Sequence, residues 1–269
     1  MIVRPLRRRG AERVERMDAG EGSPEEVAEA YRLLDTVNRR LGGHRLTERT
    51  LGPLVAGTTL SVRAGGSDTS RRLEIVDVAG GDGAFALRLR EHSLGAGRDA
   101  RVTVVDLNPV GLSASPPGVA AVRGDAFALP FADRAVDLAH CSCFFHHLST
   151  ADARDVLAEM CRVSRRAVIV NDLVRSRVAA ASIWALTRAL VSNRLVRADG
   201  PLSVLKSFLP DELLGIAHAV GISEHSSFRW TIRRGFPYRM ALVGVRLRGS
   251  GDGTEAKPEE SVEARAERR

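Results

Sequence analysis

The stretch that decides the fold is Leu73-Glu-Ile-Val-Asp-Val-Ala-Gly-Gly-Asp-Gly-Ala-Phe-Ala-Leu-Arg-Leu89, an apolar run followed by a glycine-rich turn and an amphipathic segment. This order predicts a strand, a tight turn and a helix. Gly80, Gly81 and Gly83 lack Cβ atoms, so a ligand can lie against bare backbone with the free N–H groups of the new helix facing it. The stretch therefore predicts a nucleotide-binding turn.

Asp77, at the carboxyl end of the predicted strand, narrows the choice of ligand. A carboxylate there accepts hydrogen bonds from a cationic or hydroxylated ligand and repels a phosphate. The pattern Asp77-x-Ala79-x-Gly81-x-Gly83 resembles the first motif of class I S-adenosylmethionine-dependent methyltransferases, acidic-x-Gly-x-Gly-x-Gly. Ala79 replaces the first glycine of that motif and adds a methyl group to the pocket. Because Gly81 to Ala86 also satisfies the dinucleotide fingerprint, a nicotinamide-dependent oxidoreductase remains an alternative.

Composition limits the cellular setting and the cofactors. The hydrophobic fraction is 44 %, and no run approaches the roughly 18 apolar residues that span a bilayer. No apolar segment follows the basic start of the chain, so we expect a cytoplasmic protein without membrane insertion. The three cysteines, Cys141, Cys143 and Cys161, lack partners with zinc spacing and are expected to be reduced core thiols. We expect no metal.

The charge balance raises the question of a nucleic-acid partner. A net charge of +7 would suit phosphate binding. Nearly all of the positive charge is arginine, however, with only Lys206 and Lys257 as lysines, and aromatic residues make up only 4 % of the chain. Few residues are therefore available for base stacking, and this disfavours nucleic acid. RNA methylation stays open as a further alternative.

The chain divides into four regions by composition and periodicity. A capping box at Ser23-Pro-Glu-Glu26 starts an amphipathic helix that ends at Gly42-Gly43, and a second helix is predicted from Thr47 toward Val55. The expected regions are a mobile basic arm at 1–20, an N-terminal helical lid at 21–66, a core at 67–247 with a helical insertion at about 176–208, and a disordered tail at 248–269.

Two further strand ends carry carboxylates. The β-branched run Arg101–Asp106 predicts a second strand whose terminal Asp106 can reach a ribose bound over the first turn. A third strand, Val119–Arg123, precedes Gly124-Asp-Ala-x-x-Leu-Pro-Phe-x-Asp133, which resembles the same methyltransferase family. The resemblance implies that Asp125 accepts a hydrogen bond from the adenine amine. Dinucleotide dehydrogenases have no matching phrase.

Later residues are candidates for catalysis and substrate binding. In the family, a phrase similar to Phe144-Phe-His-His-Leu148 lies on the methyl-donor side of the site, where a neutral His146 or His147 could accept a proton. Alternatively, one histidine bonds backbone and the other packs against the cofactor. Asn171 and Asp172, at the end of the fifth strand, are expected to contact substrate. Lys206 could orient an anionic or carbonyl group, or lie exposed.

The resemblance covers about residues 70–247 and implies a Rossmann-like, mostly parallel seven-stranded sheet with helices on both faces and an antiparallel C-terminal hairpin. It implies S-adenosyl-L-methionine as cofactor and methyl transfer to an oxygen or carbon nucleophile of a small, aromatic or polyketide-like molecule. The insertion at 176–208 could form a homodimer. A non-catalytic cofactor-binding regulator remains an alternative. The expected cofactor contacts are Asp77, Ala79, Gly81, Gly83, Asp106, Leu107, Asp125 and Ala126.

Overall fold

A computed structural model describes residues 13–55, 71–223 and 228–247 of the 269-residue chain. Its centre is a seven-stranded sheet of order β3-β2-β1-β4-β5-β7-β6. Strands β1 to β5 are parallel, whereas β7 pairs antiparallel with both β5 and β6. The strands are β1 (Leu73–Val78), β2 (Ala100–Asp106), β3 (Ala120–Arg123), β4 (Val136–Ser142), β5 (Ser164–Leu173), β6 (Phe228–Gly235) and β7 (Arg239–Arg246).

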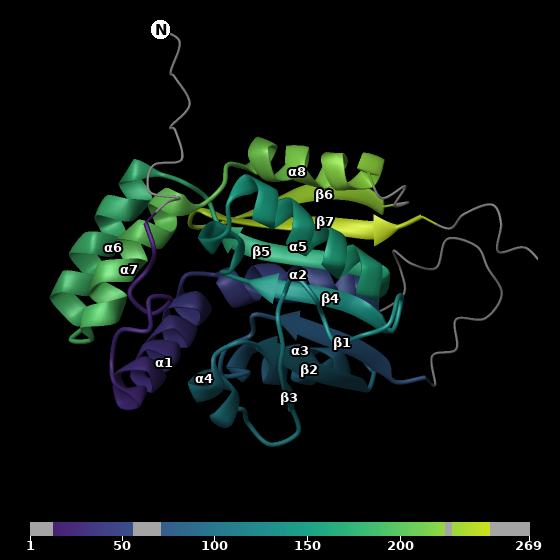
Figure 1. Ribbon diagram of the computed structural model, residues 1–269, viewed down its shortest axis with the longest axis horizontal. Helices are drawn as coiled ribbons and strands as arrows, with labels where there is room; N and C mark the ends of the chain where they lie inside the picture. Colours follow the sequence, from purple (N-terminus) through teal and green to yellow (C-terminus); the bar gives the residue numbers. More distant parts are fainter. Residues whose placement is uncertain (1–12, 56–70, 224–227, 248–269) are drawn as a thin grey trace, which may run out of the picture.

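Helices cover both faces of this sheet and one of its ends. Helices α2 and α3 lie on one face, α5 and α8 on the other, and α1, α6 and α7 gather where the parallel strands end (Figure 1). This confirms the Rossmann-like fold with its antiparallel C-terminal hairpin. The helices are α1 (Pro24–Arg40), α2 (Gly43–Val55), α3 (Ala84–Gly95), α4 (Pro109–Ser113), the 3-10 turn η1 (Phe145–His147), α5 (Thr150–Val163), α6 (Arg177–Leu190), α7 (Arg194–Lys206) and α8 (Pro210–Ser223).

The inner parallel strands β1, β2, β4 and β5 are largely apolar on both faces because helices bury both faces. Along β1, Ile75 packs with Val104 on the α2–α3 side, while Val76 and Val78 pack with Leu157 on the α5–α8 side. Each fully buried side chain of this size stabilises the fold by about 1.5–3 kcal/mol. The two apolar layers stabilise the middle of the sheet. The strand ends lie outside these layers and can therefore carry polar groups.

The insertion between β5 and α8 is helical, as expected at about 176–208. It consists of two helices, α6 and α7. Asn193 separates them, because its side chain accepts hydrogen bonds from Leu195 N and Val196 N at 3.0 and 3.2 Å and so caps α7. The second helix of the expected lid begins earlier, at Gly43 rather than Thr47.

The predicted mobile arm at 1–20 is described only in part. Residues 1–12 lie outside the described part of the chain, whereas residues 13–20 pack against the molecule. Asp199 in α7 holds this segment, since its carboxylate accepts from Arg16 N at 3.0 Å and from Met17 N at 3.2 Å. The expected tail at 248–269 falls outside the described residues. Within the described chain, every helix is too short or too polar to cross a bilayer.

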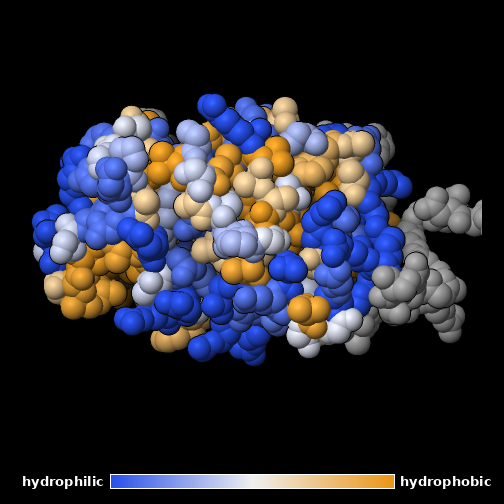
Figure 2. Space-filling view, turned by 90° about the horizontal axis from the view of Figure 1, so that it is seen from below, coloured by the Kyte–Doolittle hydropathy of each residue, from blue (hydrophilic) through white to orange (hydrophobic). Residues whose placement is uncertain are grey.

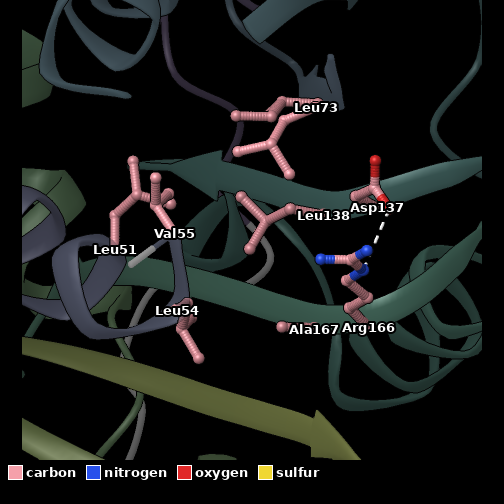
Figure 3. A pocket seen from close by; sticks show the side chains of 9 residues that line it. Leu51, Leu54, Val55, Leu73, Asp137, Leu138, Arg166 and Ala167 are labelled. Atoms are coloured by element: carbon pink, nitrogen blue, oxygen red, sulfur yellow. Dashed lines mark ion pairs between the residues drawn. The ribbon is translucent and has the colours of Figure 1, made fainter. Parts of the chain in front are cut away.

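A small cavity lies between α2 and the sheet, away from the glycine turn (Figure 3). Apolar side chains such as Leu51, Leu54 and Leu138 form its wall. At its edge Arg166 Nε lies 3.2 Å from Asp137 Oδ1. The cavity holds ≈ 20 Å³, which is room for about one water molecule. It is a packing gap and not a ligand site.

Candidate functional site

The glycine turn after β1 is held by two neighbouring elements. Asp106, at the tip of β2, accepts from Gly81 N and from Asn108 N, each at 2.8 Å. From the other side α1 packs directly on the turn, because a Cβ at Gly81 would lie 2.7 Å from Tyr31 Cε1. Gly81 also has φ 58°, a left-handed conformation that favours glycine. Gly83, with φ 71°, is the N-cap of α3 and lies behind the turn.

Ala79 adopts a conformation that suits the glycine it replaces. Its φ is 53°, and left-handed backbone costs a residue with a Cβ about 1–2 kcal/mol. Ala79→Gly removes this strain, but glycine also loses more conformational entropy on folding, which offsets part of the gain. We therefore expect the substitution to raise the free energy of unfolding by about 0.5–1 kcal/mol. Urea denaturation of both proteins would measure this difference. A loss of stability in the variant would contradict it.

A cavity of ≈ 960 Å³ opens over this turn at the ends of the parallel strands. Its size lies at the upper end of the range for small-molecule sites, roughly 300–1,000 Å³. Residues of α1, α6 and α7 form its outer wall. The predicted site residues that line it are Asp77, Ala79, Gly81, Asp106, Leu107, Asp125, Ala126, His146 and His147.

The three predicted carboxylates lie at or just after the ends of adjacent strands and differ in exposure. Asp77 is buried, Asp106 is half-buried and Asp125 is exposed. Asp77 Oδ1 lies 2.7 Å from His140 Nδ1, and the ring nitrogen donates to it there because an ionised carboxylate can only accept. His140 lies between the apolar residues Ala139 and Cys141 of β4, and a histidine at this place is a signal that the sequence interpretation left out.

Asn171 supports this group from behind instead of contacting a ligand. Its Nδ2 donates to Thr47 Oγ1 at 2.7 Å, and that hydroxyl lies 3.5 Å from His140 Nε2. A second bond from Nδ2 reaches Gly43 O at 2.6 Å. Helix α2 was predicted to start after Gly43, so the contact between its first turn and the tip of β5 was not foreseen. Asn171 is fully buried behind the cavity wall.

Two carboxylates fix the orientation of the histidine pair in η1. Asp172 accepts from His146 N at 2.9 Å, and its other oxygen lies 2.7 Å from His146 Nδ1. Asp18 Oδ2 lies 2.5 Å from His147 Nδ1. In both rings Nδ1 therefore contacts a carboxylate, and Nε2 points away from that carboxylate. Asp172 was expected to touch the substrate, but the structure buries it beneath His146.

The Nε2 atoms of both histidines face Glu15. His146 Nε2 lies 3.9 Å from Glu15 Oε1, and His147 Nε2 lies 3.8 Å from Oε2. Glu15 also accepts from Lys206 Nζ at 3.2 Å and from Ser203 Oγ at 3.0 Å. Lys206 is therefore buried behind the wall, neither exposed nor on the cavity surface. Nothing in the sequence around Glu15 indicates that its side chain is buried beside the histidines, because the composition of residues 1–20 predicts a mobile arm.

These contacts shift several pKa values. Burial alone would lower the pKa of His147, but the hydrogen bond to Asp18 and the charges of Glu15 and Asp18 raise it. Burial alone would raise the pKa of Asp172, but the His146 ring and the hydrogen bonds from His146 and Leu173 lower it.

His44 titrates in the opposite sense. Its pKa is lowered to about 3, by burial first and then by nearby guanidinium groups, although Asp35 Oδ1 lies 3.4 Å from Nε2. The unfolded chain gains a proton at His44 below about pH 6.5, whereas the folded chain does not until far lower pH. Stability is therefore lost as pH falls below 6.5, by about 2 kcal/mol at pH 5 relative to pH 7.5. We expect the free energy of unfolding of His44→Asn, measured by urea denaturation, to fall less than that of the wild type between pH 7.5 and pH 5. An equal fall in both proteins would contradict this expectation.

The rest of the cavity wall combines apolar side chains with one buried cation. The apolar members include Leu34, Leu41, Phe144, Ile183 and Val204. Arg239, at the start of β7, is buried, with Nη1 3.0 Å from Cys143 Sγ and Nη2 donating to Asn38 Oδ1. Long-range packing alone brings these three residues together, so no local pattern in the sequence indicated them.

Comparison with known proteins agrees with this geometry. Residues 75–167, about a third of the chain, match the family model of a methyltransferase domain. No protein with a curated description matches the sequence. Among solved structures, a SAM-dependent methyltransferase from Aquifex aeolicus is 14 % identical with a TM-score of 0.54 and covers 84 % of this chain and 100 % of its own.

Two further structures share the fold. The plantazolicin methyltransferase, solved with a triazolic desmethylPZN analogue and S-adenosylhomocysteine, has a TM-score of 0.59 at 10 % identity, with 84 % of this chain and 98 % of that chain covered. The magnesium protoporphyrin IX methyltransferase of Synechocystis PCC 6803, solved with bound S-adenosylhomocysteine, has a TM-score of 0.50 at 14 % identity, covering 78 % and 87 %. At these identities the likeness shows the fold alone.

The sheet order, the glycine turn and the cavity over the strand ends define a class I methyltransferase fold. Together with the match of residues 75–167 to a methyltransferase domain, they support an S-adenosylmethionine-dependent methyltransferase, an enzyme whose methyl donor is S-adenosyl-L-methionine. The residues present fit this donor. Carboxylates at the tips of β1 and β2 and after β3 suit a cationic, hydroxylated nucleoside, and Gly81 leaves no side chain between the turn and Tyr31.

Proposed function

We propose that the enzyme methylates an oxygen or carbon nucleophile of a small, largely apolar molecule of aromatic or polyketide type. The observation that carries this is the cavity, whose ≈ 960 Å³ extends past the strand-tip carboxylates to an apolar wall from α1, α6 and α7. Leu34, Ile183 and Val204 in that wall favour a planar or aliphatic acceptor over a strongly polar one.

We assign the donor to the glycine-turn side of this cavity. Asp106 would accept hydrogen bonds from ribose hydroxyls, and Asp125 from the adenine amine. Asp77, oriented by His140, would face the positively charged part of the donor, because a buried carboxylate favours a cation beside it. The remaining proposed contacts are Ala79, Gly81, Leu107 and Ala126, with Gly83 shaping the turn.

The histidine pair is proposed to act on the acceptor. When bound, the donor supplies a methyl group already activated by a sulfonium, so the protein mainly has to align the nucleophile and exclude water. The acceptor's hydroxyl or acidic carbon must also lose a proton. His146 and His147 line the cavity, and their rings are fixed by Asp172 and Asp18, which supports a role in activating the acceptor there.

Two measurements test this function. In thermal unfolding, S-adenosylhomocysteine should raise the melting temperature and NADH should not, because only a ligand of the folded state stabilises it. Incubation of phenolic and polyketide extracts with enzyme and donor should then give products heavier by one methyl group. Stabilisation by NADH alone would favour the oxidoreductase. Donor binding without methylated product from any acceptor would favour the regulator.

We also propose a homodimer through the insertion and a cytoplasmic location. Val178, Trp184 and Leu190 of α6 are 64 %, 52 % and 74 % exposed, and Figure 2 shows hydrophobic side chains gathered at the end of the molecule where α6 and α7 lie. Sedimentation velocity should give a dimer that Trp184→Glu dissociates; a monomeric wild type would contradict it. Cys141, Cys143 and Cys161 form no disulfide among the described residues, and this supports a reducing compartment.

A further inference from the structure

Glu15, His146 and His147 form a compact cluster of possible metal ligands, which we call the Glu15 triad. One ligand atom from each residue lies within 4.8 Å of those of the other two. The two Nε2 atoms approach different oxygens of the same carboxylate, at 3.9 and 3.8 Å. Around a tetrahedral ion with bonds of about 2.1 Å, ligand atoms lie roughly 3.4 Å apart, so shifts of at most about 1.4 Å would bring the three ligand atoms to these separations.

The partners behind the histidines resemble the outer shell of a metal site. Metal-binding histidines usually donate their second ring N–H to a carboxylate, which fixes the tautomer and aims the other nitrogen at the ion. His146 does so with Asp172 at 2.7 Å and His147 with Asp18 at 2.5 Å. Because an ionised carboxylate can only accept, a neutral ring has its proton on Nδ1 and its lone pair on Nε2. Both lone pairs then face Glu15.

The local charge also calls for a cation. Glu15, Asp18 and Asp172 bring three carboxylates against the ammonium of Lys206, so negative charges outnumber positive ones among these groups when both imidazoles are neutral. Glu15 and Asp172 are buried, where unbalanced charge is costly. A divalent ion would balance this charge, and so would a proton on each histidine. Binding of a divalent ion and protonation of the histidines lead to different experimental results, which are given below.

We propose that the Glu15 triad binds a divalent transition-metal ion of the Zn²⁺ type. Two imidazoles and one carboxylate are a common ligand set for such ions and leave a coordination position open. Glu15 and both histidines line the cavity, so the open position faces the space assigned to the acceptor. If the proposed function holds, this position takes an oxygen of the acceptor. The expectation of no metal from the sequence is thereby revised, because it left Glu15 out of the site.

Cobalt titration of the full-length enzyme tests the proposal, after any histidine tag is cleaved and metals are removed with a chelator. Co²⁺ is the probe because its visible absorption reports tetrahedral nitrogen and oxygen ligands. We expect one equivalent to bind with such absorption, Zn²⁺ to displace it and Mg²⁺ to leave it unchanged. Glu15→Gln and His147→Asn should each weaken Co²⁺ binding by about a hundredfold or more, whereas His218→Asn, an exposed histidine of α8, should not change it.

Lys206→Met separates a metal site from a simple ion-pair cluster. Its ammonium lies 3.2 Å from Glu15 Oε1 and repels a metal ion held by the same carboxylate. Removing it should therefore tighten Co²⁺ binding several-fold. Unchanged or weaker binding in a folded Lys206→Met protein would contradict the proposal.

Two other results would overturn the metal site. One is a wild-type enzyme without visible cobalt absorption at saturating Co²⁺. The other is an unchanged spectrum and affinity in both Glu15→Gln and His147→Asn. Stabilisation by S-adenosylhomocysteine, measured on the same metal-free samples, shows that each variant is folded and keeps the two questions apart. If the product analogue stabilises the enzyme and Co²⁺ does not bind, the metal site fails while the proposed function stands.

Discussion

Asp106→Ala is expected to weaken S-adenosylhomocysteine binding by about a hundredfold or more. The carboxylate at the tip of β2 is assigned two hydrogen bonds to the ribose, and bonds to a charged group contribute about 1.5–3 kcal/mol each. Its two oxygens also accept from Gly81 N and Asn108 N, so the substitution loosens the glycine turn itself. Isothermal titration calorimetry of both proteins would measure the loss.

Asp133→Ala provides the matched control for this experiment. Asp133 is also a carboxylate in the segment after β3, but it is exposed and pairs with Arg162 Nη1 at 2.6 Å. Its replacement should leave the affinity within a factor of about two, since exposed ion pairs contribute at most about 1 kcal/mol and this one is away from the cavity. Equal affinities of Asp106→Ala and the wild type would remove Asp106 from the donor site.

Asp172→Asn is expected to lower kcat about a hundredfold or more while leaving donor affinity unchanged. Asparagine preserves the bond from His146 N; its amide nitrogen loses the bond from Leu173 N and can donate to Nδ1 of the ring. The ring proton would then move to Nε2 and occupy the lone pair that serves the acceptor or a metal ion. Exchange of an orienting Asp for Asn has this tautomer effect in other histidine sites.

The kinetic pattern distinguishes this positioning role from a structural one. Steady-state kinetics with a methyl-accepting substrate should show the loss in kcat, with calorimetry showing wild-type affinity for S-adenosylhomocysteine. Asp155→Asn, at an exposed carboxylate of α5, is the control and should behave as the wild type. If Asp172→Asn lost donor affinity and stability along with kcat, the buried pair would be acting only as part of the fold.

The donor side of the site follows from local sequence, whereas the acceptor side does not. A strand, a glycine turn and a helix are determined by neighbouring residues, and parallel strands bring Asp77, Asp106 and the segment after β3 to one edge. Ala79 was recognised as a departure from the motif, but its left-handed backbone became visible only in the structure.

Contacts between distant segments account for what the sequence did not predict. Glu15 meets His146 and Lys206 across well over a hundred residues, and its own neighbours carry no periodicity. Asn171 and Asp172 were placed at the right strand end, but a polar residue at such an end can face the ligand or the adjoining helix. Here Asn171 hydrogen-bonds to α2 and Asp172 to η1, so both side chains contact residues that surround the cavity and do not line it themselves.

The most direct test is a crystal structure of the enzyme with S-adenosylhomocysteine. The account predicts the nucleoside across the ends of β1 and β2, with ribose oxygens within hydrogen-bonding distance of Asp106 and adenine beside Asp125. The sulfur should point toward the space bounded by His146 and the apolar wall from α6 and α7. A nucleoside bound outside this cavity, or with its ribose away from Asp106, would contradict the account.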